Sequence, residues 1–156
     1  MAIAKDRYTI SKEPGDAFTF TSVGPKGTFT VFAGFHKNRP GSSNYTFGFG
    51  EMTIDANGNI HVDDQVMLNN GDADKIFNTV GNQIYLFLKR NPDAKVYISG
   101  STPARTRIYR QLISRNFDEI SRHLKVFGLM PKNQISEFTK NTTLPYTEFL
   151  IQNNID

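Results

Sequence analysis

The spacing of apolar residues changes about halfway along the chain, and this change limits the folds it can adopt. In the first half, apolar and polar residues alternate in the segments 18–23, 28–35 and 45–49, as in β-strands with one buried face. Apolar residues then recur at steps of three and four from Ile76 to Leu88, as in a helix with one apolar face. Strands followed by helices that each need an apolar partner predict an α+β fold: an antiparallel-dominated sheet with two helices packed on one face.

Capping residues predict where the two helices begin and end. Asp72 is the expected cap of the first helix, and the segment 91–93, Asn-Pro-Asp, ends it. Thr102 is the expected cap of the second helix, with Pro103 in its first turn, where a missing N–H costs nothing. The apolar residues that predict this second helix are Tyr109, Leu112, Ile113, Phe117, Ile120 and Leu124.

Further strand signals lie between and after these segments. Asn57-Gly58 separates two apolar runs and is a strong signal for a β-hairpin. The tail returns to strand-like sequence at 126–129 and 146–151. Because the edges of a small sheet must be covered, we expect the strand at 146–151 to be a candidate for pairing with a second copy or another protein.

Composition favours one domain over residues 1–156. Hydrophobic residues make up 38% and charged residues 21%, values typical of a globular protein. With no cysteine, the chain has neither disulfides nor a cysteine-based zinc site. Residues 1–7 lack the apolar run of a signal peptide, and no segment approaches the about 18 apolar residues of a membrane span. We therefore expect a cytoplasmic protein with no membrane partner.

The positive charge is concentrated in the second half of the chain. Residues 1–94 hold nine Lys/Arg and ten Asp/Glu, whereas residues 95–156 hold nine and five. Six of the later positive charges lie between Arg105 and Lys125. Such a surface attracts phosphates, nucleic acid or an acidic partner, although a charged helix face is often only solvated.

The most informative segment for function is the strand-to-helix corner from Ser99 to Arg110. Backbone N–H groups of residues 101, 102, 104 and 105 are expected to be free there, and the helix dipole favours an anion. Arginine supplies forked donors suited to phosphate or carboxylate. The predicted ligand-binding residues are Gly100, Ser101, Thr102, Arg105, Arg107 and Arg110.

Arg105 is the residue whose role is least settled by sequence. A helical wheel puts it at the edge that faces the sheet and puts Arg107 on the outward side. An arginine turned toward the core needs an anionic partner. That partner is either an internal carboxylate, with Asp63 and Asp64 as candidates, or an external phosphate or carboxylate.

Several motifs together resemble an uncharacterised family of small Bacteroidota proteins, a domain of unknown function. They are SVGPKG at 22–27, YTFGFG at 45–50, VDDQVMLNNGD at 62–72, GSTPARTRIYR at 100–110 and YTEFLI at 146–151. The family pattern includes G-S-T-x-A-R-T-R-L-Y-R, from which this chain departs at Ile108. Other departures are Leu68 for serine and Gly50-Glu51 for Gly-Asp. The resemblance covers roughly residues 8–151 and implies one domain, but it implies no activity.

Three functions follow as hypotheses. The first is a non-enzymatic module that binds nucleic acid or a nucleotide at the corner. The second is a small nuclease or phosphotransfer enzyme of a toxin–antitoxin or phage-conflict system, with Asp63 or Asp64 as base or metal ligand. The third is a protein-interaction or assembly subunit, including a homo-oligomer.

Other residue types give weaker signals. His36, His61 and His123 lack metal-ligand spacing, and adjacent aspartates in a strand point to opposite faces, so we expect no metal and no cofactor. Thirteen phenylalanines, mostly in predicted strands, indicate a core beneath the helices; a stacking platform for single-stranded nucleic acid is the alternative.

Overall fold

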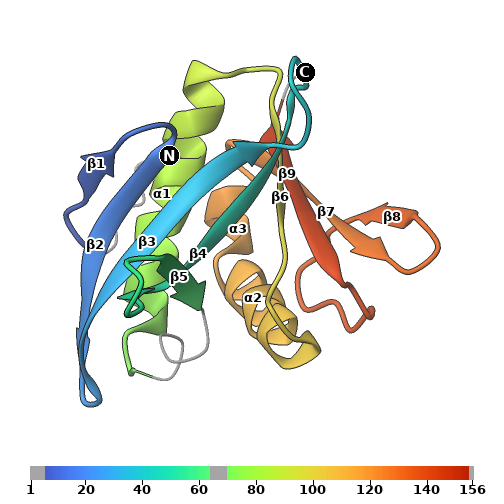
Figure 1. Ribbon diagram of the computed structural model, residues 1–156. Coiled ribbons are helices and arrows are strands. Elements are labelled where there is room, and N and C mark those ends of the chain that lie inside the picture. Colours follow the sequence, from blue (N-terminus) through green and yellow to red (C-terminus); the bar gives the residue numbers. More distant parts are fainter. Residues whose placement is uncertain (1–5, 64–69, 155–156) are drawn as a thin grey trace.

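The computed structural model describes residues 6–63 and 70–154, which form a mixed sheet with helices on one side (Figure 1). Its elements in chain order are β1 (Ser11–Glu13), β2 (Ala17–Gly24), β3 (Gly27–Lys37), β4 (Asn44–Ile54), β5 (Ile60–Asp63), α1 (Ala73–Arg90), β6 (Lys95–Ile98), α2 (Pro103–Arg115), α3 (Phe117–Ile120), β7 (Leu124–Met130), β8 (Gln134–Glu137) and β9 (Glu148–Asn153). The alternating segments are strands β2 to β4, and the helical pattern is α1, as predicted. None of the helices in these ranges is long and apolar enough to cross a membrane.

The strands hydrogen-bond in the order β1-β2-β3-β4-β6-β9-β7-β8, and β5 pairs with β4 beside this path. β4 and β6 run parallel, whereas the other pairs between described strands are antiparallel. β9 lies between β6 and β7, so both of its edges are paired within the chain. The prediction that 146–151 offers a strand edge for self-pairing is therefore wrong. The strands at the two ends of this path are β1 and β8, neither of which was predicted.

The period-two pattern of the strands separates a buried face from an uncovered face. In Figure 1 the helices lie behind the sheet, and the face toward the viewer carries no helix. On the covered face, Phe35 of β3 stacks on Phe87 of α1 with ring centroids 4.0 Å apart. Phe47 of β4 and Phe149 of β9 are fully buried in the same core. The predicted α+β sheet with its two main helices on one face is confirmed.

The second helix is shorter than its apolar stripe predicts. α2 ends at Arg115, and the single-turn α3 follows after Asn116. The Asn116 side chain donates from Nδ2 to the carbonyl oxygen of Leu112 at 2.8 Å. Such local side-chain bonds compete with helix continuation, and an apolar stripe does not reveal them. Leu124, predicted as the last apolar residue of this helix, instead begins β7.

A buried asparagine connects the β2–β3 turn to the segment before α1. Asn70 is fully buried, and its Oδ1 accepts a hydrogen bond from the backbone N–H of Lys26 at 2.8 Å. Its Nδ2 donates to Ser22 Oγ at 3.3 Å and to the carbonyl oxygen of Gly27 at 3.1 Å. Gly24 has no room for a side chain, because an added Cβ would collide with the backbone oxygen of Asn70. The SVGPKG motif is thus joined to Asn70 of the motif at 62–72.

Asp72 occupies the predicted N-cap position of α1, but its side chain does not cap the helix. Its Oδ2 accepts hydrogen bonds from the Tyr8 hydroxyl and from Ser22 Oγ, both at 2.6 Å. Burial, and then this bond to Asp72, raise the pKa of the Tyr8 phenol. Asp72 therefore anchors the N-terminal segment and β2 to the start of α1.

Candidate functional site

One edge of β4 is divided between two partner strands, and a cavity lies at the division. Residues 44–46 pair in parallel with β6, and residues 51–54 pair antiparallel with β5. Residues 47–50 have no partner on that edge among the described strands. A cavity of about 290 Å³ lies against this stretch. Its lining residues are Phe47, Gly48, Phe49, Val62, Asp63, Ile98, Ser99, Gly100, Ser101 and Tyr109.

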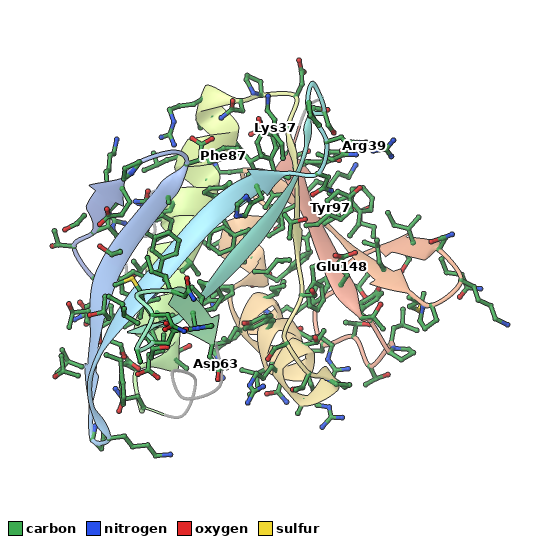
Figure 2. All side chains as sticks on the ribbon, viewed as in Figure 1. Lys37, Arg39, Asp63, Phe87, Tyr97 and Glu148 are labelled. Atoms are coloured by element: carbon green, nitrogen blue, oxygen red, sulfur yellow. The ribbon has the colours of Figure 1, made fainter. Side chains whose placement is uncertain are left out.

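The predicted strand-to-helix corner forms one wall of this cavity. β6 ends at Ile98 and α2 begins at Pro103, and residues 99–101 between them line the cavity. The opposite wall comes from the end of β5, where Figure 2 labels Asp63. The structure thus brings a segment near residue 100 next to one near residue 60, a proximity that spacing along the chain does not reveal.

Gly100 allows the end of β6 to pack closely on the first turn of α2. Its N–H donates to Thr106 Oγ1 at 3.0 Å, and the Thr106 hydroxyl donates to the carbonyl oxygen of Thr102 at 3.2 Å. An added Cβ at Gly100 would lie 2.5 Å from the backbone nitrogen of Thr106 and 2.7 Å from the carbonyl carbon of Arg105. Sequence reasoning missed buried Thr106, although its place one helical turn after the cap residue was a usable signal.

The start of α2 is capped from within the chain. Thr102 Oγ1 accepts from the backbone N–H of Arg105 at 3.3 Å, which confirms the predicted cap. The expectation of a free N–H at Arg105 is therefore wrong. The Arg105 guanidinium donates from Nη1 to Ser101 Oγ at 2.8 Å. Because Ser101 lines the cavity, the positive charge of Arg105 lies next to that wall.

The three predicted arginines do not converge on one point. Arg105 reaches Ser101, whereas Arg107 is exposed on the outward side, as the helical wheel predicts. Arg110 donates from Nη1 to the carbonyl oxygen of Leu144 at 3.3 Å, in the segment before β9. Of the three, Arg105 is the one that the structure places beside a cavity-lining residue.

Asp63 adds a carboxylate to the cavity wall. It is the last residue of β5, and it pairs with Glu51 of β4. The two strands approach closely here, because an added Cβ at Gly50 would lie 2.6 Å from the backbone carbon of Asp63. Asp64 lies outside the described residues, so an ion pair of Arg105 with Asp63 or Asp64 stays a prediction.

The histidines lie apart from the cavity lining. His61 Nε2 is 2.8 Å from Asp55 Oδ2 at the predicted Asn57-Gly58 hairpin, and this bond lowers the pKa of the Asp55 carboxyl. Burial lowers the pKa of His123, whose ring packs edge-on against Tyr85 with centroids 5.7 Å apart. Within 6–63 and 70–154, no group of three or more His, Asp or Glu side chains is arranged to hold a metal ion.

The sequence matches a family of unknown function, DUF6934, over residues 4–154. The chain belongs to DUF6934. The region assigned to DUF6934 contains every strand and helix from β1 to β9, together with the cavity. No curated protein and no solved structure matches the chain significantly.

Proposed function

We propose that this protein is a binding module that holds a phosphorylated ligand, a nucleotide or one unit of a nucleic acid, in the cavity beside the Ser99–Arg110 corner. The observation that carries the proposal is the position of Ser101: it lines the cavity and accepts a hydrogen bond from Arg105. A guanidinium and the start of a thirteen-residue helix therefore act on the same wall. Both favour an anion, and the guanidinium suits phosphate in particular.

The remaining lining indicates what else the ligand carries. Asp63 supplies a carboxylate, which accepts hydrogen bonds from the sugar hydroxyl and base amino groups that a nucleotide carries and a bare phosphate does not. Val62, Gly48 and Tyr109 supply apolar and ring surface. A volume of about 290 Å³ lies near the lower end of the roughly 300–1,000 Å³ typical of small-molecule pockets. A sugar-phosphate with a base fits this mixture better than a bare anion or a duplex.

The test compares ligand-induced stabilisation in matched variants. The melting temperature of wild type is measured separately with inorganic phosphate, with a nucleoside and with a nucleoside monophosphate. A ligand at a hundred times its Kd adds about 2.7 kcal/mol to the free energy of unfolding. That stabilisation corresponds to a rise of about 5–11 °C in a domain of this size. We expect the largest rise with the monophosphate, its loss in Arg105→Ala, and its retention in Arg107→Ala, an exposed arginine on the same helix.

Two results would contradict this proposal. One is a wild-type melting temperature that none of the three ligands changes. The other is an Arg105→Ala protein destabilised by about 3–5 kcal/mol without ligand, as expected if Arg105 neutralises a buried carboxylate. Arg105 would then serve the architecture of the corner.

The presence of Asp63 in the cavity also favours a second candidate, a small nuclease or phosphotransfer enzyme. Asp63 would act as the base or as a metal ligand opposite the Arg105 wall. The measurement is cleavage of RNA and DNA with Mg²⁺ or Mn²⁺, in wild type and in Asp63→Asn. Cleavage that persists in Asp63→Asn, or that is absent from wild type, contradicts this candidate.

A further inference from the structure

The face of the sheet turned away from the helices carries a row of apolar side chains near its centre. The strand registers align Tyr97 of β6 with Leu150 of β9, and Leu150 with Phe127 of β7. Leu150 is only 5% exposed, while the rings of Tyr97 and Phe127 on either side of it remain partly accessible. Figure 2 shows Tyr97 on the face toward the viewer, where no helix covers the strands.

The neighbouring row on the same face is basic. The next aligned residues are Lys95 of β6, Gln152 of β9 and Lys125 of β7. The loop that carries Arg39 adjoins this row, because the backbone N–H of Lys95 donates to the carbonyl oxygen of Ser43 at 2.9 Å. Figure 2 shows Arg39 at this end of the sheet, above Tyr97.

The opposite side of the aromatic row is acidic and apolar. Glu148 of β9 aligns with Leu129 of β7, on the side of Tyr97 that is farther from Lys95. The character of the uncovered face therefore changes along its strands: a row with two lysines is followed by a row with two accessible rings and then by a row with a carboxylate. Glu137 of β8 lies at the outer end of the aromatic row, opposite Phe127.

We infer that this face binds single-stranded nucleic acid, with bases stacked on Tyr97 and Phe127 and phosphates on Lys95, Lys125 and Arg39. Strands β6 and β7 are separated by β9, so their backbones lie about 9.6 Å apart, which leaves room for one base on each ring. Base stacking on aromatic rings combined with a cationic track is the usual way proteins hold single strands. Glu148 can accept hydrogen bonds from the amino groups of base edges. A duplex keeps its bases stacked within the helix and cannot use the rings.

This surface is separate from the cavity of the proposed function. Lys95 lies on the side of Tyr97 that faces away from Ser99, so the phosphate positions inferred here differ from the Ser101–Arg105 wall. Binding of a single strand to the uncovered face does not require binding of a mononucleotide in the cavity. The two can therefore succeed or fail independently.

The experiment measures fluorescence anisotropy of a labelled single-stranded oligonucleotide of about eight nucleotides, within the roughly 4–16 that one small domain covers. We expect Tyr97→Ala and Phe127→Ala each to weaken binding by about 5- to 150-fold, the range for loss of one stacked base. Tyr97→Phe should keep wild-type affinity. Lys95→Ala and Lys125→Ala should each lower the slope of log K against log salt by about 0.7.

Matched controls lie on the covered side of the sheet. Tyr85→Ala removes a half-buried ring from α1, and Lys12→Ala removes an exposed lysine from β1; neither should change binding. Circular dichroism identifies any variant that fails to fold, and Tyr97→Phe and Lys95→Ala still test the inference if Phe127→Ala does not fold. Three results with wild type would overturn the inference. They are no binding of the single strand, equally tight binding of a duplex, and release of the oligonucleotide when an acidic peptide is added at equal concentration. An unchanged affinity in Tyr97→Ala also overturns it.

Discussion

Gly100→Ala tests how tightly the strand-to-helix corner is packed. The added methyl would lie 2.5 Å from the backbone nitrogen of Thr106, so the end of β6 and the first turn of α2 must separate. Forcing extra volume into a packed site costs about 1–3 kcal/mol. Separation also breaks the Gly100–Thr106 hydrogen bond, worth about 0.5–1.5 kcal/mol. We therefore expect a loss of about 2–4 kcal/mol from a total stability of about 5–15 kcal/mol.

The assay is thermal unfolding followed by circular dichroism, with Gly48→Ala as the matched control. Gly48 lines the same cavity, but an added Cβ there has no neighbour within 4 Å. Because alanine suits a strand better than glycine does, we expect Gly48→Ala to gain about 0.5–1 kcal/mol. Gly100→Ala should melt about 4–16 °C below wild type. If Gly100→Ala has the same melting temperature as wild type, the corner accommodates the methyl group without loss of stability and the packing argument fails.

Two other substitutions test the buried polar groups. Asn70→Ala removes the hydrogen bonds to the Lys26 N–H and the Gly27 carbonyl. We therefore expect its free energy of unfolding, measured in urea, to fall by about 2–5 kcal/mol. The control Asn38→Ala, at an exposed position, should change this free energy by at most about 0.5 kcal/mol. Burial raises the pKa of Glu148, because it disfavours the charged carboxylate in the folded protein. The protonated side chain therefore adds to folding stability below the ordinary glutamate pKa of about 4.3. This added stability is lost as the pH rises through the higher pKa of the folded state. The stability of Glu148→Gln relative to wild type should therefore increase from acid to neutral pH in urea unfolding; parallel pH profiles would contradict this.

Sequence patterns predicted the elements of this fold better than their arrangement. The alternation at 18–23 and 45–49 and the helical spacing from Ile76 to Leu88 are local signals, and all three segments form as predicted. The pairing of β9 between β6 and β7 depends on contacts far apart in the chain, and no local pattern encodes it.

The candidate site shows the same division. Thr102 was recognisable as a cap because capping depends on neighbouring residues. The approach of Asp63 to the Ser99–Ser101 segment depends on the tertiary fold and was proposed only as one alternative. The Thr102 cap already implies a hydrogen bond from the Arg105 N–H, which the expectation of a free N–H there overlooked. The turn of Arg110 toward Leu144 depends on a side-chain conformation that local sequence does not fix.

The central place of β9 also determines when this sheet can be completed during synthesis. β6, β7 and β8 leave the ribosome before β9, yet β6 and β7 reach each other only through it. Until then Val96 and Val126, almost fully buried in the finished sheet, lie on strands whose inner edges are open. Open apolar edges are templates for misassembly, and non-local pairing is slow. A nascent chain paused before residue 148 should therefore depend on chaperones until β9 closes the sheet.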